Sequence, residues 1–322
     1  MTIANPHFIE GAIDAATLRL KRHAALASIS VGAVLIAIKV YAYLATKSVS
    51  LLSSLMDSCF DTLASLITFM SVLHAATPAD AQHRFGHGKM EALSALAQAV
   101  FVTLTACFLL YEAASRLINP VAIETPVTGI VVTLVSIVLT IGLVLFQRHV
   151  IKRTQSIAIT ADHLHYKGDL LMNMGVIAAL LITGYTGIAA VDALFALGIA
   201  LHLLWGVWGI VRQSVDILMD KELPPATRKD ILALINRHPK AVDVHDLRTR
   251  NTGERIFIEF HLELDGNMSL KAAHQVTEEI EKILFDAYPA SEVIIHQEPA
   301  GLDDHRIDDQ VRHAGEQQQA AP

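Results

Sequence analysis

Two apolar stretches of the chain each carry a pair of ionisable residues spaced four apart. Asp57 and Asp61 form the first pair, and His165 and Asp169 form the second. This spacing places both members of a pair on one face of a helix. Three carboxylates together in hydrocarbon require a cation, and a set of His and Asp ligands suits Zn²⁺. The four residues therefore predict a metal site. Two alternatives stay open: Asp57 lines water near one end of its helix, or His165 bonds a backbone carbonyl.

A polar loop between these two stretches carries a second set of potential ligands. Asp80, His83 and His87 are spaced three and four apart, and they can converge on a metal if the loop turns at Gly86 and Gly88. Three protein ligands leave an open or water-filled position on a tetrahedral ion. The alternative is a solvated polar loop without a metal.

The C-terminal third is also rich in metal-ligating residue types. His245 and His261 fall on adjacent expected strands, where they can be cross-strand neighbours. His296 lies on a further strand, His274 opens the helix between them, and Glu298 follows His296 by two residues. This group predicts a further metal site, and scattered surface histidines are the alternative.

Six long apolar segments must position the first two sets of potential metal ligands, the two ionisable pairs and the polar loop. Hydrophobic residues make up 52% of the 322 residues and charged residues only 18%, against about 25% charged in soluble proteins. A membrane span takes about 20 apolar residues. The segments that qualify are roughly 24–46, 51–76, 93–117, 127–146, 156–184 and 188–210. Lys and Arg are more frequent in alternate loops, which predicts that both termini are cytoplasmic.

The two ionisable pairs are expected at similar depths in the membrane. Asp61 lies about ten residues from the outer start of its span and Asp169 about thirteen from the inner start, so a rise of about 1.5 Å per residue brings both near the middle. Asp162 and His163 lie one turn earlier and are interpreted as residues of the cytosolic approach. Lys39 is expected to extend its ammonium group outward along its apolar stem.

The composition changes after residue 221. Residues 222–300 carry many charges, and their patterns predict the order α-β-β-α-β, which is typical of a small two-layer α+β domain. Residues 1–23 are expected to form a cytoplasmic segment, residues 24–221 the transmembrane domain, and residues 301–322 a disordered tail. The net charge of −7 argues against nucleic-acid binding, and no phosphate-binding loop for ATP is present.

Seven segments together resemble the cation diffusion facilitator family, in particular its bacterial zinc and iron efflux members. The segments are Met56-Asp-Ser-Cys-Phe-Asp61, Phe85-Gly-His-Gly-Lys89, Phe146-Gln-Arg-His-Val150, Ala161-Asp-His-Leu-His-Tyr-Lys-Gly-Asp169, Asp192-Ala-Leu-Phe-Ala-Leu-Gly198, His245-Asp-Leu-Arg-Thr-Arg250 and Ile294-Ile-His-Gln297. The resemblance implies an all-α six-helix transmembrane bundle, followed by a metallochaperone-like α+β cytoplasmic domain. It also implies a homodimer in the lipid of the bacterial inner membrane.

The resemblance also assigns residues to sites. The family's transport site corresponds to Asp57, Asp61, His165 and Asp169, and its loop site to Asp80, His83 and His87. Its binuclear cytoplasmic site corresponds to His245, His261, His296 and Gln297, with His274 also matching. Glu298 stands where the nearest members have Asp, and a glutamate can still ligate. A charged interlock between protomers would involve Lys89 and Asp220.

The implied function is transport, not enzymatic catalysis. The expected activity is export of Zn²⁺ from the cytoplasm in exchange for protons, with Cd²⁺, Fe²⁺ or Mn²⁺ as further candidate substrates. Protons compete with the metal because ligands bind metal only when deprotonated. A passive divalent-metal channel is the alternative. A zinc-dependent membrane hydrolase is disfavoured, because a closed cage of four protein ligands leaves no position for a reactive water.

Overall fold

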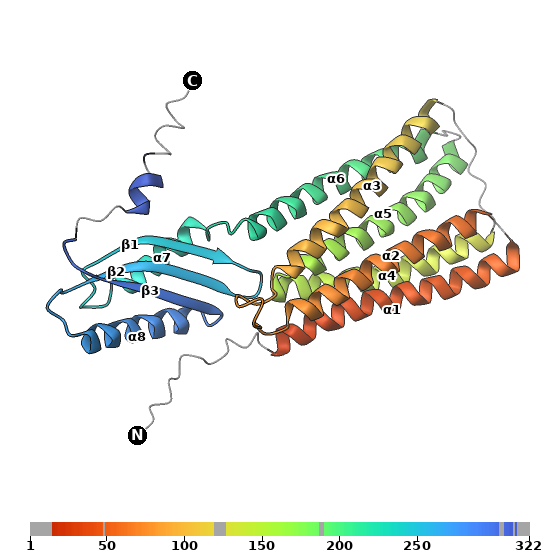
Figure 1. The fold of residues 1–322 in the computed structure, drawn as a ribbon. Coiled ribbons are helices and arrows are strands. Elements are labelled where there is room, and N and C mark those ends of the chain that lie inside the picture. Colours follow the sequence, from red (N-terminus) through yellow and green to blue (C-terminus); the bar gives the residue numbers. More distant parts are fainter. Residues whose placement is uncertain are drawn as a thin grey trace. The chain divides into compact units, whose positions relative to one another are not determined.

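The computed structural model describes residues 15–47, 49–118, 127–186, 190–302, 306–311 and 313. They belong to two compact units, one from Asp14 to Asp216 and the other containing the chain from Ile217 onward. In the described part of the first unit, six helices are long and apolar enough to cross a membrane (Figure 1). They are α1 (Ala15–Thr46), α2 (Val49–Ala75), α3 (Met90–Ile118), α4 (Val127–Thr154), α5 (Ile157–Thr186) and α6 (Ala190–Leu218).

The helix α1 begins before residue 24, where the apolar segment predicts its start. Lys21 belongs to residues 1–23, the segment expected to be cytoplasmic. In the structure Lys21 is buried in α1, and its Nζ donates to Oε1 of Glu91 at 2.8 Å. The Ser156 hydroxyl donates to the other oxygen of Glu91 at 2.5 Å. This paired and hydrogen-bonded charge allows the helix to extend beyond its apolar part.

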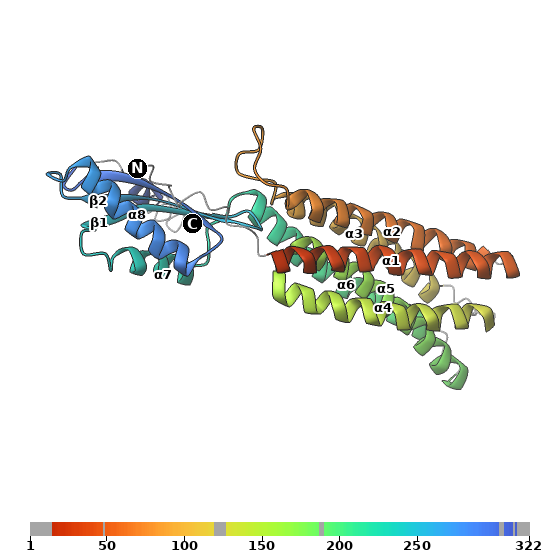
Figure 2. The same ribbon diagram turned by 90° about the horizontal axis from the view of Figure 1, so that it is seen from below.

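Close helix packing brings the ligand-bearing helices together. α1 packs against α2 and α4, and α5 packs against α3 and α4 (Figure 2). A Cβ atom at Gly32 would overlap the side chain of Thr62, so glycine is required where α1 approaches α2. A Cβ at Gly206 would come within 2.7 Å of a terminal methyl group of Leu164, so α6 and α5 also approach closely, although the leucine side chain could move to admit it.

The second unit has the predicted α-β-β-α-β order. Its elements are α7 (Pro225–Ile235), β1 (Asp243–Asn251), β2 (Ile256–Leu264), α8 (Leu270–Ala287) and β3 (Ser291–Pro299). The strand order is β1-β2-β3, with β1 antiparallel and β3 parallel to β2. Ile231 of α7 and Ile280 of α8 share one buried core with Ile258 and Phe260 of β2. Both helices therefore cover the same face of the sheet, and the predicted fold class is confirmed.

The other face of the sheet carries two rows of polar residues. His245, His261 and His296 are register partners across the three strands, and so are Asp243, Glu263 and Glu298. Alternate residues of a strand point to the same face, so the histidine row and the acidic row lie side by side. The strand pairing alone thus brings six potential metal ligands to one surface.

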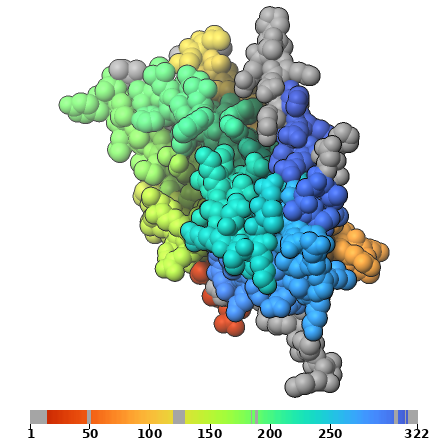
Figure 3. Space-filling model, turned by 90° about the vertical axis from the view of Figure 1, so that its left-hand side faces the viewer, coloured from red at the N-terminus to blue at the C-terminus, as the bar shows by residue number. Residues whose placement is uncertain are grey.

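Part of the tail that the sequence predicts to be disordered is described by the structure. Residues 307–311 form a short helical segment, and the N–H groups of Ile307 and Asp308 donate to the carboxylate of Asp246 in β1. Figure 3 shows the dark-blue C-terminal atoms lying against the cyan and blue atoms of the α+β domain. The polar composition of the tail predicts disorder, but it does not reveal these specific hydrogen bonds.

Candidate metal sites

The membrane site lies between α2 and α5. His165 is buried, and its Nε2 lies 2.9 Å from Oδ1 of Asp61 and 3.6 Å from Oδ2 of Asp169. One potential ligand atom from each of these three residues lies within 4.8 Å of the others. The depths of the two pairs predict this meeting, because α2 and α5 enter the membrane from opposite sides. The arrangement can bind one divalent cation through a nitrogen and two carboxylates.

Asp57 does not join this group in the structure. It lies one helical turn before Asp61 and is exposed. The four-residue spacing therefore brings His165 and Asp169 into one group on α5, but it does not do so for Asp57 and Asp61 on α2. Lys39, expected to extend outward alone, donates instead to the carbonyl of Ser54 at 3.0 Å and to the hydroxyl of Ser58 at 2.7 Å. Its ammonium group is thereby fixed to α2.

Asp162 is fully buried, so the interpretation as a residue of the cytosolic approach is wrong for it. Its carboxylate accepts hydrogen bonds from the hydroxyls of Ser28 at 2.6 Å and Ser65 at 2.9 Å, and from Nε2 of Gln147 at 2.8 Å. Nε2 of Gln98 adds a longer bond of 3.3 Å. Asp162 of α5 therefore links α1, α2, α3 and α4 through hydrogen bonds, and it lies one helical turn before His165. The polar residue types were visible in the sequence, but their convergence was not.

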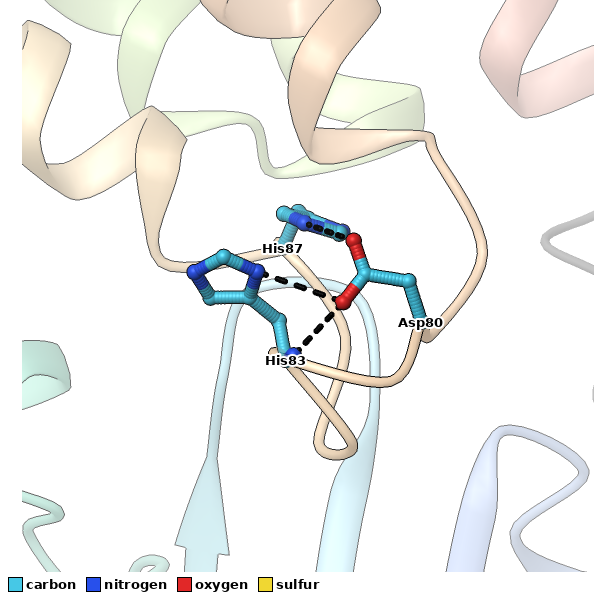
Figure 4. A group of neighbouring side chains, drawn as sticks. All are labelled: Asp80, His83 and His87. Carbon is cyan, nitrogen blue, oxygen red and sulfur yellow. Dashed lines mark hydrogen bonds and ion pairs between the residues drawn. The ribbon is translucent and has the colours of Figure 1, made fainter.

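The loop site is compact (Figure 4). Oδ1 of Asp80 lies 3.3 Å from Nδ1 of His83, and Oδ2 lies 3.4 Å from Nε2 of His87. The backbone N–H groups of His83 and Gln82 donate to Asp80 and lower the pKa of its carboxyl group. Nδ1 of His87 faces the carbonyl of Thr77 at 3.4 Å, which leaves Nε2 directed at the shared centre. All three predicted residues come together here, and Gly86 adopts the positive φ of 82° that the turn requires.

The cytoplasmic cluster forms around Glu298 of β3. Its carboxylate lies 2.7 Å from Nδ1 of His261, 3.2 Å from Nε2 of His245 and 3.6 Å from Nε2 of His296. The ring centroids of His261 and His296 are 4.7 Å apart. Histidine and carboxylate groups at these separations suit Zn²⁺. Nδ1 of the buried His245 has no hydrogen-bond partner among the described residues, which is unusual for a buried polar atom.

Two residues assigned to this site by resemblance lie elsewhere in this chain. Gln297 is adjacent to the histidine row in sequence, but alternation turns it to the helical face, where its Nε2 donates to Thr277 of α8 at 3.2 Å. His274 is exposed on α8 and pairs with Glu278 at 3.3 Å. Neither contributes to the cluster around Glu298 within this chain.

A further group of potential ligands was missed in the sequence. One atom each of Asp243, His245 and Glu263 also lies within 4.8 Å of the others. The alternation of the strands indicates this group in the sequence. Asp243 and His245 are two apart on β1 and so share a face, and Glu263 pairs with Asp243 from β2. The carboxylates of Asp243 and Glu263 are already paired with Arg306, at 3.0 Å and 2.6 Å.

The residues of the expected charged interlock lie at helix ends. Lys89 directly precedes α3, and Asp220 follows α6 with a positive φ of 53°. Their pairing between protomers stays a prediction.

Comparisons with known proteins agree with this architecture. Residues 25–219 match the family model described as the cation efflux transmembrane domain, and residues 223–300 match the cytoplasmic domain of cation efflux proteins. The chain is 42% identical over 284 residues to the cation-efflux pump FieF of Citrobacter koseri, which covers 88% of this chain and 94% of that protein. FieF of Salmonella schwarzengrund gives the same identity and coverage.

Among solved structures, the metal-bound C-terminal domain of the CzcD transporter from Thermotoga maritima is 35% identical. The match covers 26% of this chain and all of that domain, with a TM-score of 0.24. On the family models and the FieF relatives, this chain belongs to the cation diffusion facilitator family and is a multi-pass membrane protein that exports metal cations.

Proposed function

We propose that the protein exports Zn²⁺ from the bacterial cytoplasm in exchange for protons, through the site formed by Asp61, His165 and Asp169. The observation that carries this proposal is the position of His165 between two carboxylates, Asp61 of α2 and Asp169 of α5. These groups bind metal only when deprotonated, so protons and Zn²⁺ compete for them. Cd²⁺, Fe²⁺ and Mn²⁺ are further candidate substrates.

The competition supplies the coupling between the two fluxes. Zn²⁺ from the cytoplasm displaces protons from His165 and an aspartate, and protons from outside displace the metal after the site has opened to the other face. Protonation also removes the repulsion between Asp61 and Asp169, so that the empty site can return without a metal. Alternating exposure of one central site is the general scheme of secondary transporters.

We further propose that the protein works as a homodimer in the inner membrane, with both termini cytoplasmic. The short name of the matched cytoplasmic family model, ZT_dimer, denotes a dimerisation domain and supports this assembly. In this assembly the six helices that are long and apolar enough to cross a membrane are placed in the lipid. Metal bound by the cytoplasmic cluster then stabilises this domain without lying on the transport path.

Zinc uptake into proteoliposomes is expected to depend on an imposed pH gradient. With an acidic interior, outward proton movement drives Zn²⁺ inward, and reversal of the gradient opposes it. Uptake is measured with a zinc-sensitive dye inside the vesicles, at both gradient directions and with a protonophore. A passive channel gives uptake that follows the zinc gradient alone, and that result contradicts proton exchange.

Loss of the cytoplasmic cluster is expected to remove most of the zinc-linked stability of the α+β domain. Ligand binding to the folded state at about 100 times its Kd stabilises that state by about 2.7 kcal/mol. The full-length protein carries Asp61→Ala and His83→Ala to silence the other sites, and thermal unfolding is measured with and without Zn²⁺. Addition of His245→Ala and His261→Ala should abolish the zinc-induced shift.

The matched control for this experiment is His238→Ala. His238 belongs to the same domain but pairs with Glu279 at 2.9 Å, outside the cluster. This variant is expected to keep the zinc-induced shift even if its metal-free stability falls. An equally large shift in the variant lacking His245 and His261 contradicts the proposed cytoplasmic site.

A further inference from the structure

The chain segment after the α+β domain is attached to a β-bulge in β1. The register of β1 and β2 shifts between His245 and Arg248, and within this bulge Asp246 has a positive φ of 53°. Its carboxylate accepts from the N–H groups of Ile307 at 3.0 Å and Asp308 at 2.9 Å. Asp308 in turn accepts from the N–H of Asp246 at 2.9 Å. This reciprocal pairing fixes the segment directly beside the ligand His245.

The same segment inserts a cation into the acidic row of the sheet. Asp243 and Glu263 face each other across β1 and β2, where two like charges repel. The guanidinium of Arg306 bridges them, with Nη1 3.0 Å from Asp243 and Nη2 2.6 Å from Glu263. Glu263 is largely buried, with its side chain 10% exposed. Arg306 therefore neutralises the pair and fixes the orientation of the Glu263 carboxylate.

Glu263 lies next to the free nitrogen of His245. Nε2 of His245 faces Glu298 in the cluster, while Nδ1 has no hydrogen-bond partner among the described residues and lies 3.9 Å from Oε1 of Glu263. A histidine that ligates metal through one ring nitrogen usually donates its other N–H to a carboxylate or carbonyl. Glu263 is the carboxylate positioned to receive this proton when Nε2 binds a metal.

We propose that Arg306 is a positioning residue of the cytoplasmic metal site, acting through Glu263 on His245. By fixing the Glu263 carboxylate beside Nδ1, it selects the tautomer of His245 whose Nε2 is free to ligate. The C-terminal segment thereby raises the metal affinity of the cluster. This inference rests on the proposed cytoplasmic site. It also explains why Asp243 and Glu263 resemble a metal site, since the guanidinium of Arg306 already neutralises them.

Zinc affinity of the cytoplasmic site tests this proposal. The full-length protein with Asp61→Ala and His83→Ala competes for Zn²⁺ with a chromogenic chelator. Changes to partners that orient metal ligands typically cost 10- to 100-fold in affinity, so Arg306→Ala should weaken binding by about tenfold or more. Arg255→Ala is the control, with unchanged affinity expected, because it removes an equally exposed guanidinium of the same domain that pairs with Glu292 at 3.8 Å, outside the cluster. Arg306→Lys should restore part of the affinity, because an ammonium group can still pair with Glu263.

A double-mutant comparison separates positioning from general stabilisation. Glu263→Gln should weaken zinc binding as Arg306→Ala does, and the two changes together should cost little more than either alone. The visible spectrum of bound Co²⁺ should change in both single variants, since it reports the ligand geometry. If Arg306→Ala weakens zinc binding as much in the Glu263→Gln background as in the wild-type background, the two losses are additive. That result contradicts the proposal.

His245→Ala distinguishes failure of this inference from failure of the site itself. If this change leaves zinc affinity intact, the proposed cytoplasmic site is wrong, and the positioning role falls with it. If it weakens binding while Arg306→Ala has no effect, the site stands and only the role of Arg306 is wrong. Tighter zinc binding in Arg306→Ala indicates that Asp243 and Glu263 themselves take a metal, which also overturns the proposal.

Discussion

Replacement of Asp61 or Asp169 by alanine is expected to abolish zinc transport while the protein remains folded. Each change removes one of the two carboxylates beside His165, at 2.9 Å and 3.6 Å from its Nε2. Loss of a direct ligand should cost more than loss of a partner that only orients a ligand, which is about 10- to 100-fold. Initial rates of Zn²⁺ uptake into proteoliposomes should therefore fall at least about 100-fold.

Asp192→Asn is the matched control for these variants. Asp192 is also an acidic residue within a spanning helix, but it pairs with Arg116 at 2.8 Å rather than with His165. Its replacement should leave most of the transport rate. Asp57→Ala is expected to have an intermediate transport rate, because Asp57 shares the face of α2 with Asp61 but lies outside the three-residue group. Wild-type rates in Asp61→Ala or Asp169→Ala would show that the proposed transport site is wrong.

The substitution His165→Asp is expected to change which metal is carried. Imidazole nitrogen suits Zn²⁺, whereas sites made of oxygen ligands alone suit Mn²⁺ and other harder ions. The variant should gain Mn²⁺ transport and lose its preference for Zn²⁺, by about tenfold or more in the ratio of rates. Its pH dependence should also change, since a group that ordinarily titrates near pH 6.5 is replaced by one near pH 4.

Transport of both metals at pH 6 and pH 8 tests the role of His165. His163→Asp makes the same substitution two positions earlier on α5, outside the group of Asp61, His165 and Asp169, and should not alter the metal ratio. If His165 serves only helix packing, its variant is less stable but has an unchanged metal ratio and pH profile. That combination would falsify the assignment of His165 as a selecting ligand.

The sequence predicts the elements of this fold well because their signals are local. Long apolar segments indicate the six helices, and alternation in 242–250 and 255–264 indicates two strands. Depth arithmetic also brings Asp61 and Asp169 to one level. It does not fix the rotation of a helix about its axis, which decides that Asp162 faces the interior.

Other features depend on contacts that no local pattern encodes. Gln297 follows a histidine of the cluster, yet alternation in β3 turns it toward α8. The docking of Arg306 requires both the bulge at Asp246 and the acidic pair of Asp243 and Glu263. The polar tail composition therefore predicted disorder where the structure forms specific hydrogen bonds.

The most direct test of zinc–proton exchange is the proton flux that zinc itself causes. Purified protein is reconstituted into vesicles that contain a pH indicator, without an imposed pH gradient, and Zn²⁺ is added outside. Under zinc–proton exchange, Zn²⁺ entry is accompanied by proton exit and a rise in internal pH, and both signals are lost in Asp169→Ala. Zinc entry without any change in internal pH, or proton movement that persists in Asp169→Ala, would contradict it.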